Sequence, residues 1–321
     1  MSGHPAVAGW CAYAGTAARP VAVETIARSK KSAVYRLCGA GPGGSGIVAK
    51  AQSPEGLRVE RAIYEAVLPL TAVSTMNCYG AIEMPDGWCW IFLEDAGGRA
   101  YDPGSSRDRV LAARWLAEMH AATSRLTPPA SLPKSDMPRY RDTVMRVRES
   151  LTGAAARRPL AASDRRMLTS LVGQLNALDA IWPDVEAQAV ALPTGLVHGD
   201  FCAKNLRVRV ARGATELAVF DWDMAAWGVC ASDLAGATLE SATPSTLVYW
   251  RTIRRSFPHI DQYAVRAAAW SGAILRLIAA IEWELAKSNP PRDRWALNNL
   301  SQYHALLRDA IGARPTRRNG R

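Results

Sequence analysis

The sequence lacks several features that mark whole classes of protein. Its six cysteines are scattered over 321 residues, with no C-x-x-C pair and no cysteine or histidine at the spacing of a zinc site. Its most apolar stretch, residues 267–286, is interrupted by Arg276, Glu282 and Glu284. We therefore expect reduced thiols without disulfides, and no segment that crosses a membrane.

Nucleic-acid-binding motifs are also missing, although the chain carries a net charge of +10. It has no zinc finger, no aromatic RNA-binding motif and no basic stripe along a helix, so we expect no nucleic-acid partner. The positive excess lies beyond residue 95, because residues 1–95 hold eight basic and eight acidic side chains. Residues 1–10 show no secretion signal, so we expect a cytoplasmic protein.

What is present is the composition of a globular protein, with 49% hydrophobic and 21% charged residues. Within residues 1–95, short segments rich in β-branched residues alternate with turns, which predicts an antiparallel sheet. The expected strands are 21–28, 33–38, 46–50, 78–83 and 88–94. Apolar residues at helical spacing predict one helix, 57–68, after the third strand.

Helical periodicity dominates after a linker at 97–106 that contains Gly and Pro. The expected helices are 107–124, 140–151, 165–181 and several more within 233–312. A β-hairpin, 206–210 with 217–220, interrupts them. The sequence therefore predicts a small sheet followed by a larger and mainly helical part.

Three polar residues surround the predicted hairpin. Asp200 and Asn205 stand five residues apart before its first strand, and Asp221 follows its second strand. In-line phosphoryl transfer needs a carboxylate that orients the attacking hydroxyl and accepts its proton, and oxygen ligands that hold Mg²⁺ between the phosphates. A loop and a hairpin arranged in this way can bring all three side chains into one cleft. The pattern indicates phosphoryl transfer.

These residues resemble the aminoglycoside phosphotransferase and choline kinase family, which is related to the protein kinases. His198-Gly199-Asp200 with Asn205 resembles the family's catalytic loop, and Asp221 with the following Trp resembles its metal-binding motif. Further matched segments are 47–50, which ends in Lys50, Glu60 within 59–64, the hinge strand 90–95, the helix motif 116–120, Gly228 and 233–235. Together these motifs follow the family's order from about residue 28 to 235.

The resemblance implies an α+β, protein-kinase-like fold with two lobes. Residues 1–95 would form a small N-terminal lobe, an antiparallel sheet with one helix, that binds the nucleotide. Residues 96–321 would form a larger and mainly helical C-terminal lobe that carries the catalytic loop and the acceptor site. A hinge near residues 92–98 would join the two lobes.

The resemblance also implies an ATP-dependent O-phosphotransferase that uses Mg²⁺, with GTP left open as an alternative donor. Asp200 would orient the acceptor hydroxyl or act as its base, and Asn205 and Asp221 would ligate magnesium. Lys50 would contact the α- and β-phosphates, and Glu60 would hold its ammonium group. The other expected nucleotide contacts are Ser32 in the loop over the phosphates, and the backbones of Leu93 and Asp95 at adenine.

Neighbouring polar residues have simpler structural explanations. We expect His198 to brace the loop through hydrogen bonds, His120 to be a buried core histidine and Asp233 to cap a helix that begins there. Glu65 lies on the same predicted helix as Glu60, and helical spacing alone does not decide which of them meets the lysine; the motif favours Glu60. The roles of Lys204 and Asp223 stay open.

A glycine-rich segment at 39–44 matches G-x-G-x-x-G literally, a pattern typical of dinucleotide binding. That fingerprint needs its glycines to open a helix, whereas here a strand is expected next and Pro42 interrupts. We therefore predict a turn between the second and third strands. The loop expected over the phosphates is 29–32, which contains no glycine.

The acceptor is expected to be a hydroxyl of a small molecule. The resemblance favours an aminoglycoside or a related antibiotic, and a role in antibiotic resistance or self-protection. Glu240, Glu282 and Glu284 are the acidic candidates for holding such a polycation. The excess of positive charge beyond residue 95 would repel a polycation. An uncharged sugar or another metabolite is therefore an alternative acceptor. A non-catalytic nucleotide-binding module is a further alternative.

Overall fold

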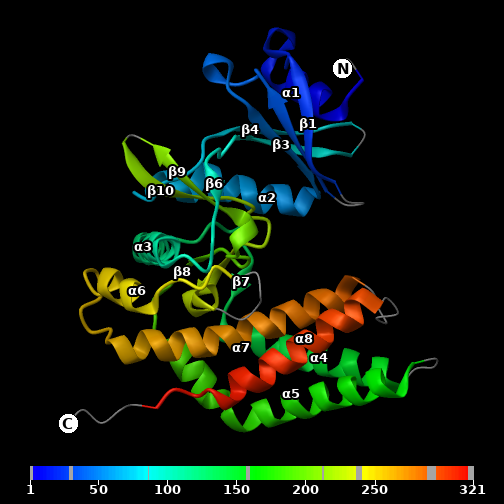
Figure 1. Ribbon diagram of the computed structural model, residues 1–321, viewed down its shortest axis with the longest axis vertical. Coiled ribbons are helices and arrows are strands. Elements are labelled where there is room, and N and C mark those ends of the chain that lie inside the picture. The colour runs from blue at the N-terminus through cyan, green and yellow to red at the C-terminus, as the bar shows by residue number, and fades with distance from the viewer. Residues whose placement is uncertain are drawn as a thin grey trace. The chain divides into compact units, whose positions relative to one another are not determined.

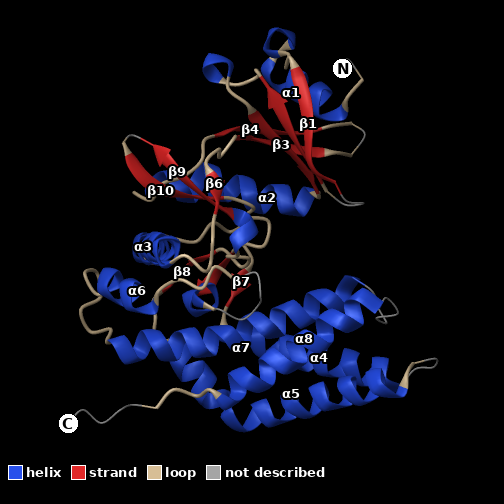
Figure 2. Ribbon diagram, viewed as in Figure 1, coloured by secondary structure: helices blue, strands red, loops and turns tan. Residues whose placement is uncertain are grey.

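The computed structural model describes residues 3–28, 32–85, 87–156, 160–211, 213–235, 241–287 and 294–316. The chain forms two compact units (Figures 1 and 2). The first consists of Met1–Tyr101, Thr127–Leu132 and Ala203–Ala225, and the second of Asp102–Leu126, Pro133–Cys202 and Ala226–Arg321. The hairpin that follows the His-Gly-Asp motif thus belongs to the unit of the N-terminal sheet, whereas the motif itself belongs to the helical unit.

The first unit is built on an antiparallel sheet of five strands in the order β1-β2-β3-β5-β4. The strands are β1 (Ala22–Arg28), β2 (Ala33–Cys38), β3 (Ile47–Gln52), β4 (Cys78–Glu83) and β5 (Cys89–Glu94). Burial alternates along β2, as expected for a strand with one face on the core, whereas the central strands β3 and β5 are buried almost throughout. The predicted sheet is confirmed.

The glycine-rich segment forms the turn between β2 and β3. Its middle is a short 3-10 helix, Pro42–Gly44, and Gly43 and Gly44 have φ of +64° and +79°, values that favour glycine. The strand β3 follows it, and no α-helix begins there. The segment is therefore a turn, as predicted, and lacks the helix N-terminus that a dinucleotide fingerprint requires.

The helix inserted after β3 is α2 (Pro54–Ala62). Ser53 caps it, because its side chain accepts a hydrogen bond from the Gly56 N–H, and Pro54 occupies the first helical position. A π-helical turn, Ile63–Val67, and a 3-10 turn, Leu68–Leu70, continue the chain. The predicted helix thus begins three residues earlier than expected, and its second half departs from α-helical geometry.

A helix absent from the sequence prediction, α1 (Pro5–Ala14), packs against the sheet. Its Trp10 is buried and lies edge-on to Phe92 of β5, with ring centroids 5.0 Å apart. Gly9 is buried where a Cβ would stand 2.9 Å from the ring of Trp90. The segment is apolar on nearly every side, so it has no amphipathic period from which a helix could be predicted.

The hairpin consists of β9 (Leu206–Ala211) and β10 (Ala214–Val219). Their register pairs Leu206 with Val219, and the short strand β6 (Arg99–Ala100) pairs with the other edge of β9. Arg209 of β9 connects the hairpin to β5, because its guanidinium lies 2.6 Å from a carboxylate oxygen of Glu94. Pairing across the base of the hairpin brings its two ends together, which places the residues that precede β9 beside those that follow β10.

The second unit is mainly helical. Its helices are α3 (Ser106–Thr123), α4 (Met137–Ala156), α5 (Ala162–Ala189), α6 (Thr246–Ile253), α7 (Gln262–Lys287) and α8 (Arg294–Gly312). Helices α4, α5, α7 and α8 pack on one another (Figure 1). The prediction that this part of the chain is mainly helical is confirmed. Helices α4 and α5, however, extend several residues beyond their predicted ends, and α5 continues through Pro183.

The prediction of a helix beginning at Asp233 is wrong. Cys230–Leu234 forms a 3-10 helix, Ala235 lies outside any helix, and the next α-helix among the described residues begins at Thr246. A small sheet was also missed, in which β11 (Ala226–Val229) lies between β7 (Lys134–Ser135) and β8 (Thr194–Val197). These strands are two to four residues long, too short to show an alternating pattern in the sequence.

Helix α7 is long and apolar enough to pass a test for membrane crossing on length and composition. However, 61% of its most apolar window is buried inside the protein. Its neighbours include α4, α5 and α8, and Ile274, Leu275 and Ile278 are fully buried. The helix therefore has the environment of a core helix.

Candidate active site

A buried ion pair joins the sheet to α2. Lys50 lies in the central strand β3, and its Nζ is 2.9 Å from Oε2 of Glu60 in α2. Both residues are buried, Glu60 completely. Glu65 instead forms an exposed ion pair with Arg61. The structure therefore pairs the lysine with Glu60, the partner that the motif favoured.

Glu60 also connects this pair to the segment after the hairpin. Its Oε2 accepts a hydrogen bond from Gln52 Nε2 at 2.9 Å, and its Oε1 accepts one from the backbone N–H of Trp222 at 3.3 Å. The Lys50 ammonium donates a further hydrogen bond to Oδ1 of Asp221. Residues from β3, α2 and the segment after β10 thus form one network of charges within the first unit.

The charge state of Lys50 follows from this environment. Burial by itself lowers the pKa of the Lys50 ammonium, but the negative charges of Glu60, Asp221 and Asp223 outweigh that effect. The net result is a raised pKa, so the side chain keeps its positive charge at all physiological pH values. A fixed cation inside the first unit is the group that phosphate oxygens would need.

Asp221 has an unusual backbone. Its φ is +70°, in the left-handed region that non-glycine residues rarely occupy, and such a conformation costs about 1–3 kcal/mol. Its side chain keeps 32% exposure although it meets the Lys50 ammonium. Strain of this kind persists only where the surrounding structure enforces it, and it is frequent at functional sites.

Asn205 lies at the other end of the hairpin. It is buried, and its backbone carbonyl accepts a hydrogen bond from the N–H of Phe220 at 3.2 Å. The two expected metal ligands, Asn205 and Asp221, therefore flank the same base of the hairpin. Among the described residues no three His, Cys, Asp or Glu side chains gather as a metal site. One carboxylate and one amide oxygen suit Mg²⁺, a hard cation that keeps water and phosphate oxygens as its other ligands.

Asp200 lies in the second unit, five residues before Asn205 along the chain. Its carboxylate forms an ion pair with the guanidinium of Arg276, from the middle of α7. Its backbone N–H donates to Nδ1 of His198 at 3.3 Å, a contact by which His198 supports the loop. In the sequence, Arg276 is distinguished only as a charge within an apolar stretch.

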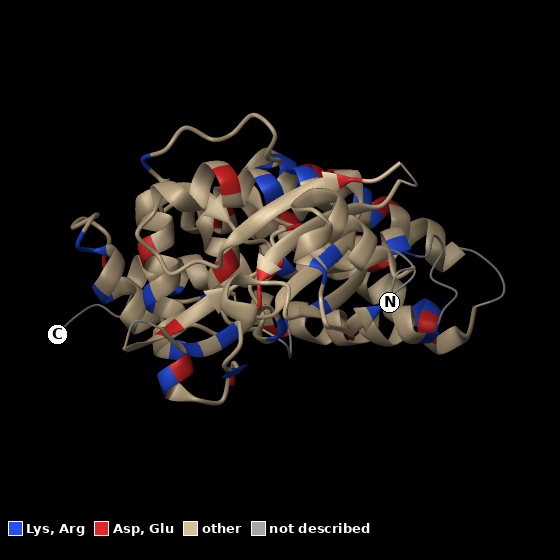
Figure 3. Cartoon of the chain, turned by 90° about the horizontal axis from the view of Figure 1, so that it is seen from above, with Lys and Arg blue, Asp and Glu red and all other residues tan. Residues whose placement is uncertain are grey.

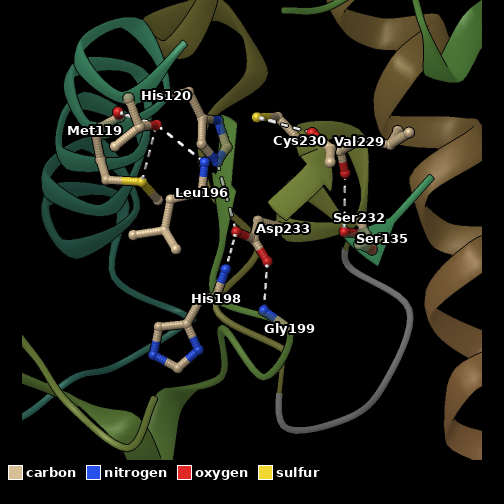
Figure 4. A network of polar contacts seen from close by, with 12 residues as sticks. Met119, His120, Ser135, Leu196, His198, Gly199, Val229, Cys230, Ser232 and Asp233 are labelled. Carbon is tan, nitrogen blue, oxygen red and sulfur yellow. Dashed lines mark hydrogen bonds and ion pairs between the residues drawn. The ribbon is translucent and has the colours of Figure 1, made fainter. Parts of the chain in front are cut away.

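Asp233 anchors the loop before Asp200 through hydrogen bonds. Its carboxylate accepts hydrogen bonds from the backbone N–H groups of His198, at 2.7 Å, and Gly199, at 3.1 Å. Figure 4 shows the ring of His120 on the other side of this carboxylate; its Nε2 lies 3.5 Å from Oδ2, while its Nδ1 is hydrogen-bonded to the hydroxyl of Tyr249 at 2.9 Å. Asp233 is thus an anchor, as expected, but it anchors this loop and caps no helix.

The environment of Asp233 keeps it ionised. Burial alone raises the pKa of its carboxyl, but the hydrogen bond and charge of His120 and the contacts of His198 act in the opposite direction and prevail. The net pKa of Asp233 is lowered. A buried carboxylate that accepts several hydrogen bonds fixes the backbone of the loop that presents Asp200.

The remaining expected nucleotide contacts lie at the sheet. Leu93 is buried in β5, where it pairs with Val48 and Cys78. Asp95 follows β5, and its carboxylate lies 2.6 Å from Nε of Arg36. Ser32 precedes β2 and is half-buried, whereas residues 29–31 of the predicted phosphate loop lie outside the described residues.

Comparison with known proteins shows the family and the fold of the chain. Residues 47–251 match the phosphotransferase enzyme family (APH). A GDP complex of a variant of aminoglycoside 2'-phosphotransferase-IIIa has a similar fold, with a TM-score of 0.65, 13% sequence identity, and coverage of 92% of this chain and 94% of that one. Choline kinase from Cryptosporidium parvum has a TM-score of 0.62 at 10% identity, with 91% and 90% coverage.

A microcompartment-associated aminopropanol kinase is similar as well, with a TM-score of 0.58, 16% identity, and coverage of 89% of this chain and 90% of that one. A search of curated proteins gives no match. The family match and the fold together define a phosphotransferase of the protein-kinase-like class. The chain belongs to the APH phosphotransferase family, and it is a small-molecule kinase whose acceptor is an alcohol group.

Proposed function

We propose that the protein transfers the γ-phosphoryl group of ATP to a hydroxyl of a small molecule in the cytoplasm. The observation that carries this proposal is the network of Lys50, Glu60 and Asp221, with Asn205 at the same base of the hairpin. A buried cation, a strained and partly exposed carboxylate and an amide oxygen are an unusual set for a purely structural purpose. They are the groups that a metal-bound triphosphate requires.

Each residue has a role in this proposal. Lys50 binds the α- and β-phosphates while Glu60 holds its ammonium in place, and Ser32 and the backbones of Leu93 and Asp95 bind the rest of the nucleotide. Asn205 and Asp221 would hold Mg²⁺, which supplies positive charge against the phosphate oxygens. Asp200 orients the acceptor hydroxyl and accepts its proton. Residues 1–95 would thus bind the nucleotide, and residues 96–321 the acceptor.

GTP remains a second candidate donor. Two of the structurally similar aminoglycoside phosphotransferases were solved with GDP. Leu93 and Asp95 are proposed to contact the nucleobase through their backbone groups. Backbone groups do not by themselves select adenine over guanine. Parallel assays with ATP and GTP at equal concentration decide between the two donors.

An aminoglycoside is the acceptor class that the family favours, with antibiotic inactivation or self-protection as the role. The described acidic candidates do not support it: Glu282 is paired with Arg146 at 2.7 Å, and Glu284 is buried at the contact with α8. Glu240 lies outside the described residues. A sugar or another metabolite alcohol is therefore the second candidate, and the positive balance of the second unit favours it.

The test is nucleotide turnover in the presence of a panel of acceptors. We expect ADP release that requires Mg²⁺ and that falls by at least about 10³-fold in Asp200→Ala and Asp221→Ala. Glu60→Gln and Glu65→Gln form a matched pair on one helix, and only the first should reduce turnover. Nucleotide binding without turnover, unaffected by Asp200→Ala, would instead support the non-catalytic module.

A further inference from the structure

The ion pair between Arg276 and Asp200 lies where the acceptor hydroxyl must bind if the proposed function holds. Nη2 of Arg276 donates to Oδ1 of Asp200, and the two residues are 76 positions apart in the sequence. Both side chains keep 20% exposure, so this pair is accessible to a ligand. A charge in the middle of the core helix α7 is costly to bury, which calls for a reason beyond packing.

The guanidinium of Arg276 has N–H donors that form no hydrogen bond with the described residues. Within the described part of the chain its one side-chain partner is Asp200, reached through Nη2. Arginine carries five N–H donors in a planar fork, and those on Nε and Nη1 have no hydrogen-bond acceptor among the described residues. A partly exposed guanidinium with unused donors is suited to bind the oxygen atoms of a carboxylate or phosphate.

No described acidic residue of α7 lies on the same stripe as Arg276, where it could pair with the guanidinium in place of a ligand. Ala269, Ala273 and Ala280 share the half-buried stripe of Arg276, because they recur at helical spacings of three and four residues. The acidic residues nearest along the helix are Glu282, held by Arg146, and Glu284, which is buried. Over the chain as a whole, basic and acidic positions are interspersed (Figure 3). Among the described residues of α7, Arg276 is therefore the one charge on this stripe, and Asp200 is its partner from the catalytic loop.

The geometry points to Arg276 as the residue that positions Asp200 and selects the acceptor: the substrate is an alcohol that carries an oxyanion, a carboxylate or a phosphate, near its reactive hydroxyl. One side of the guanidinium orients the Asp200 carboxylate, and the other side binds the oxyanion. An ammonium group at the same place would meet the guanidinium and lose binding energy. This inference rests on the proposed function, because it assigns Asp200 to the acceptor hydroxyl.

The reaction balances without another reactant. The acceptor oxygen forms a bond to the γ-phosphorus, the bond from that phosphorus to the bridging oxygen breaks, and the nucleoside diphosphate leaves with the bond's electron pair. Asp200 takes the proton of the hydroxyl. Arg276 exchanges no proton or electron, and it acts by holding the carboxylate and the acceptor in line.

The test compares acceptors that differ only in charge. Glucose, glucosamine, glucuronate and glucose 6-phosphate form one series, glycerol, 3-amino-1,2-propanediol, glycerate and glycerol 1-phosphate a second, and kanamycin represents polycations. We expect kcat/KM for an anionic member to exceed that of its matched amine by at least about 10-fold. A carboxylate preferred over a phosphate, or the reverse, identifies the oxyanion.

Variants of Arg276 then connect the preference to this residue. Arg276→Met should raise KM for the anionic acceptor by about 10–100-fold, while KM for the nucleotide stays unchanged. Arg276→Lys should recover part of the loss, and Arg276→Glu should shift the preference toward the amine. Arg146→Met removes an arginine that pairs with the same helix, and it should change neither constant.

Two results would overturn the inference. One is a wild-type preference for the amine or for kanamycin; the other is Arg276→Met with unchanged acceptor KM in a protein whose thermal unfolding matches the wild type. A loss confined to kcat would assign Arg276 to the transferring phosphoryl group instead. If no acceptor is phosphorylated and Asp200→Ala leaves nucleotide turnover unchanged, the proposed function itself fails.

Discussion

Asp221 in the first unit and Asp233 in the second show two different uses of a carboxylate. Asp221 has a strained backbone, keeps 32% side-chain exposure and meets a buried ammonium. Asp233 is almost fully buried, and two backbone N–H groups and a histidine ring surround it. The first is held in a costly state that a ligand can use, whereas the second is satisfied by its own chain and stabilises a loop.

The largest effect should follow from Asp221→Asn, which keeps the shape and removes the charge. We expect kcat/KM to fall by at least about 10³-fold, because the proposed Mg²⁺ site would lose its charged ligand. The free energy of unfolding should change by less than about 1 kcal/mol, since Glu60 still pairs with Lys50, the Asp221 side chain is partly exposed, and Asn tolerates a positive φ at least as well as Asp. ADP release and urea unfolding measure the two quantities. A large loss of stability would mean that Asp221, like Asp233, mainly holds the fold.

Lys50→Met should come next, because it leaves the fully buried Glu60 carboxylate without its cation. We expect the free energy of unfolding to fall by about 3–5 kcal/mol and turnover by more than about 100-fold. The double variant Lys50→Met/Glu60→Gln should recover part of the stability and none of the turnover. Equal stability of the single and double variants would show that the pair is not coupled as the structure indicates.

Asp233→Asn should destabilise the protein by about 2–3 kcal/mol, because the backbone N–H groups of buried His198 and half-buried Gly199 lose a charged acceptor. The folded-state pKa of Asp233 is lowered, so the advantage of Asp over Asn is present above the ordinary value of 3.8 and is lost as the pH falls through the folded pKa. Unfolding curves of both proteins between pH 7 and pH 3 test this. A difference that already disappears near pH 6 would contradict the lowered pKa.

The smallest effect should come from Arg36→Met at the edge of the first unit. Arg36 pairs with Glu24 and Asp95 at 2.7 and 2.6 Å, but its side chain is 38% exposed. Exposed ion pairs contribute little, so we expect a change below about 1 kcal/mol by thermal unfolding. A loss comparable to that of Lys50→Met would remove the distinction between buried and exposed pairs on which the comparison depends.

Much of the fold could be predicted from local patterns. The strands β2 and β4 were predicted to the residue, because β-branched and apolar residues run between clear turn signals. Helix α1 was missed since it is apolar on nearly every side, and β7, β8 and β11 were missed since each is too short to show a period. The boundary at Asp233 was misplaced, because an Asp before an apolar segment is also typical of a helix cap.

The candidate site was predicted as a set of motifs, but its contacts were not. Helical spacing could not choose between Glu60 and Glu65, and only the packing of α2 against β3 places one of them at Lys50. Arg276 gave one signal in the sequence, a charge far from the ends of an apolar helix. That signal shows that something must compensate the charge, without showing which residue does.

The sequence by itself determined the kinds and order of most elements and the candidate residues for phosphoryl transfer, because backbone periods and motif spacings are set by neighbours a few positions away. The tertiary structure alone decided which charges meet. Asp233 reaches backbone 35 positions away, and Arg276 reaches Asp200 across 76. Pairing and burial depend on distance in space, and distance along the chain carries no information about it at such separations.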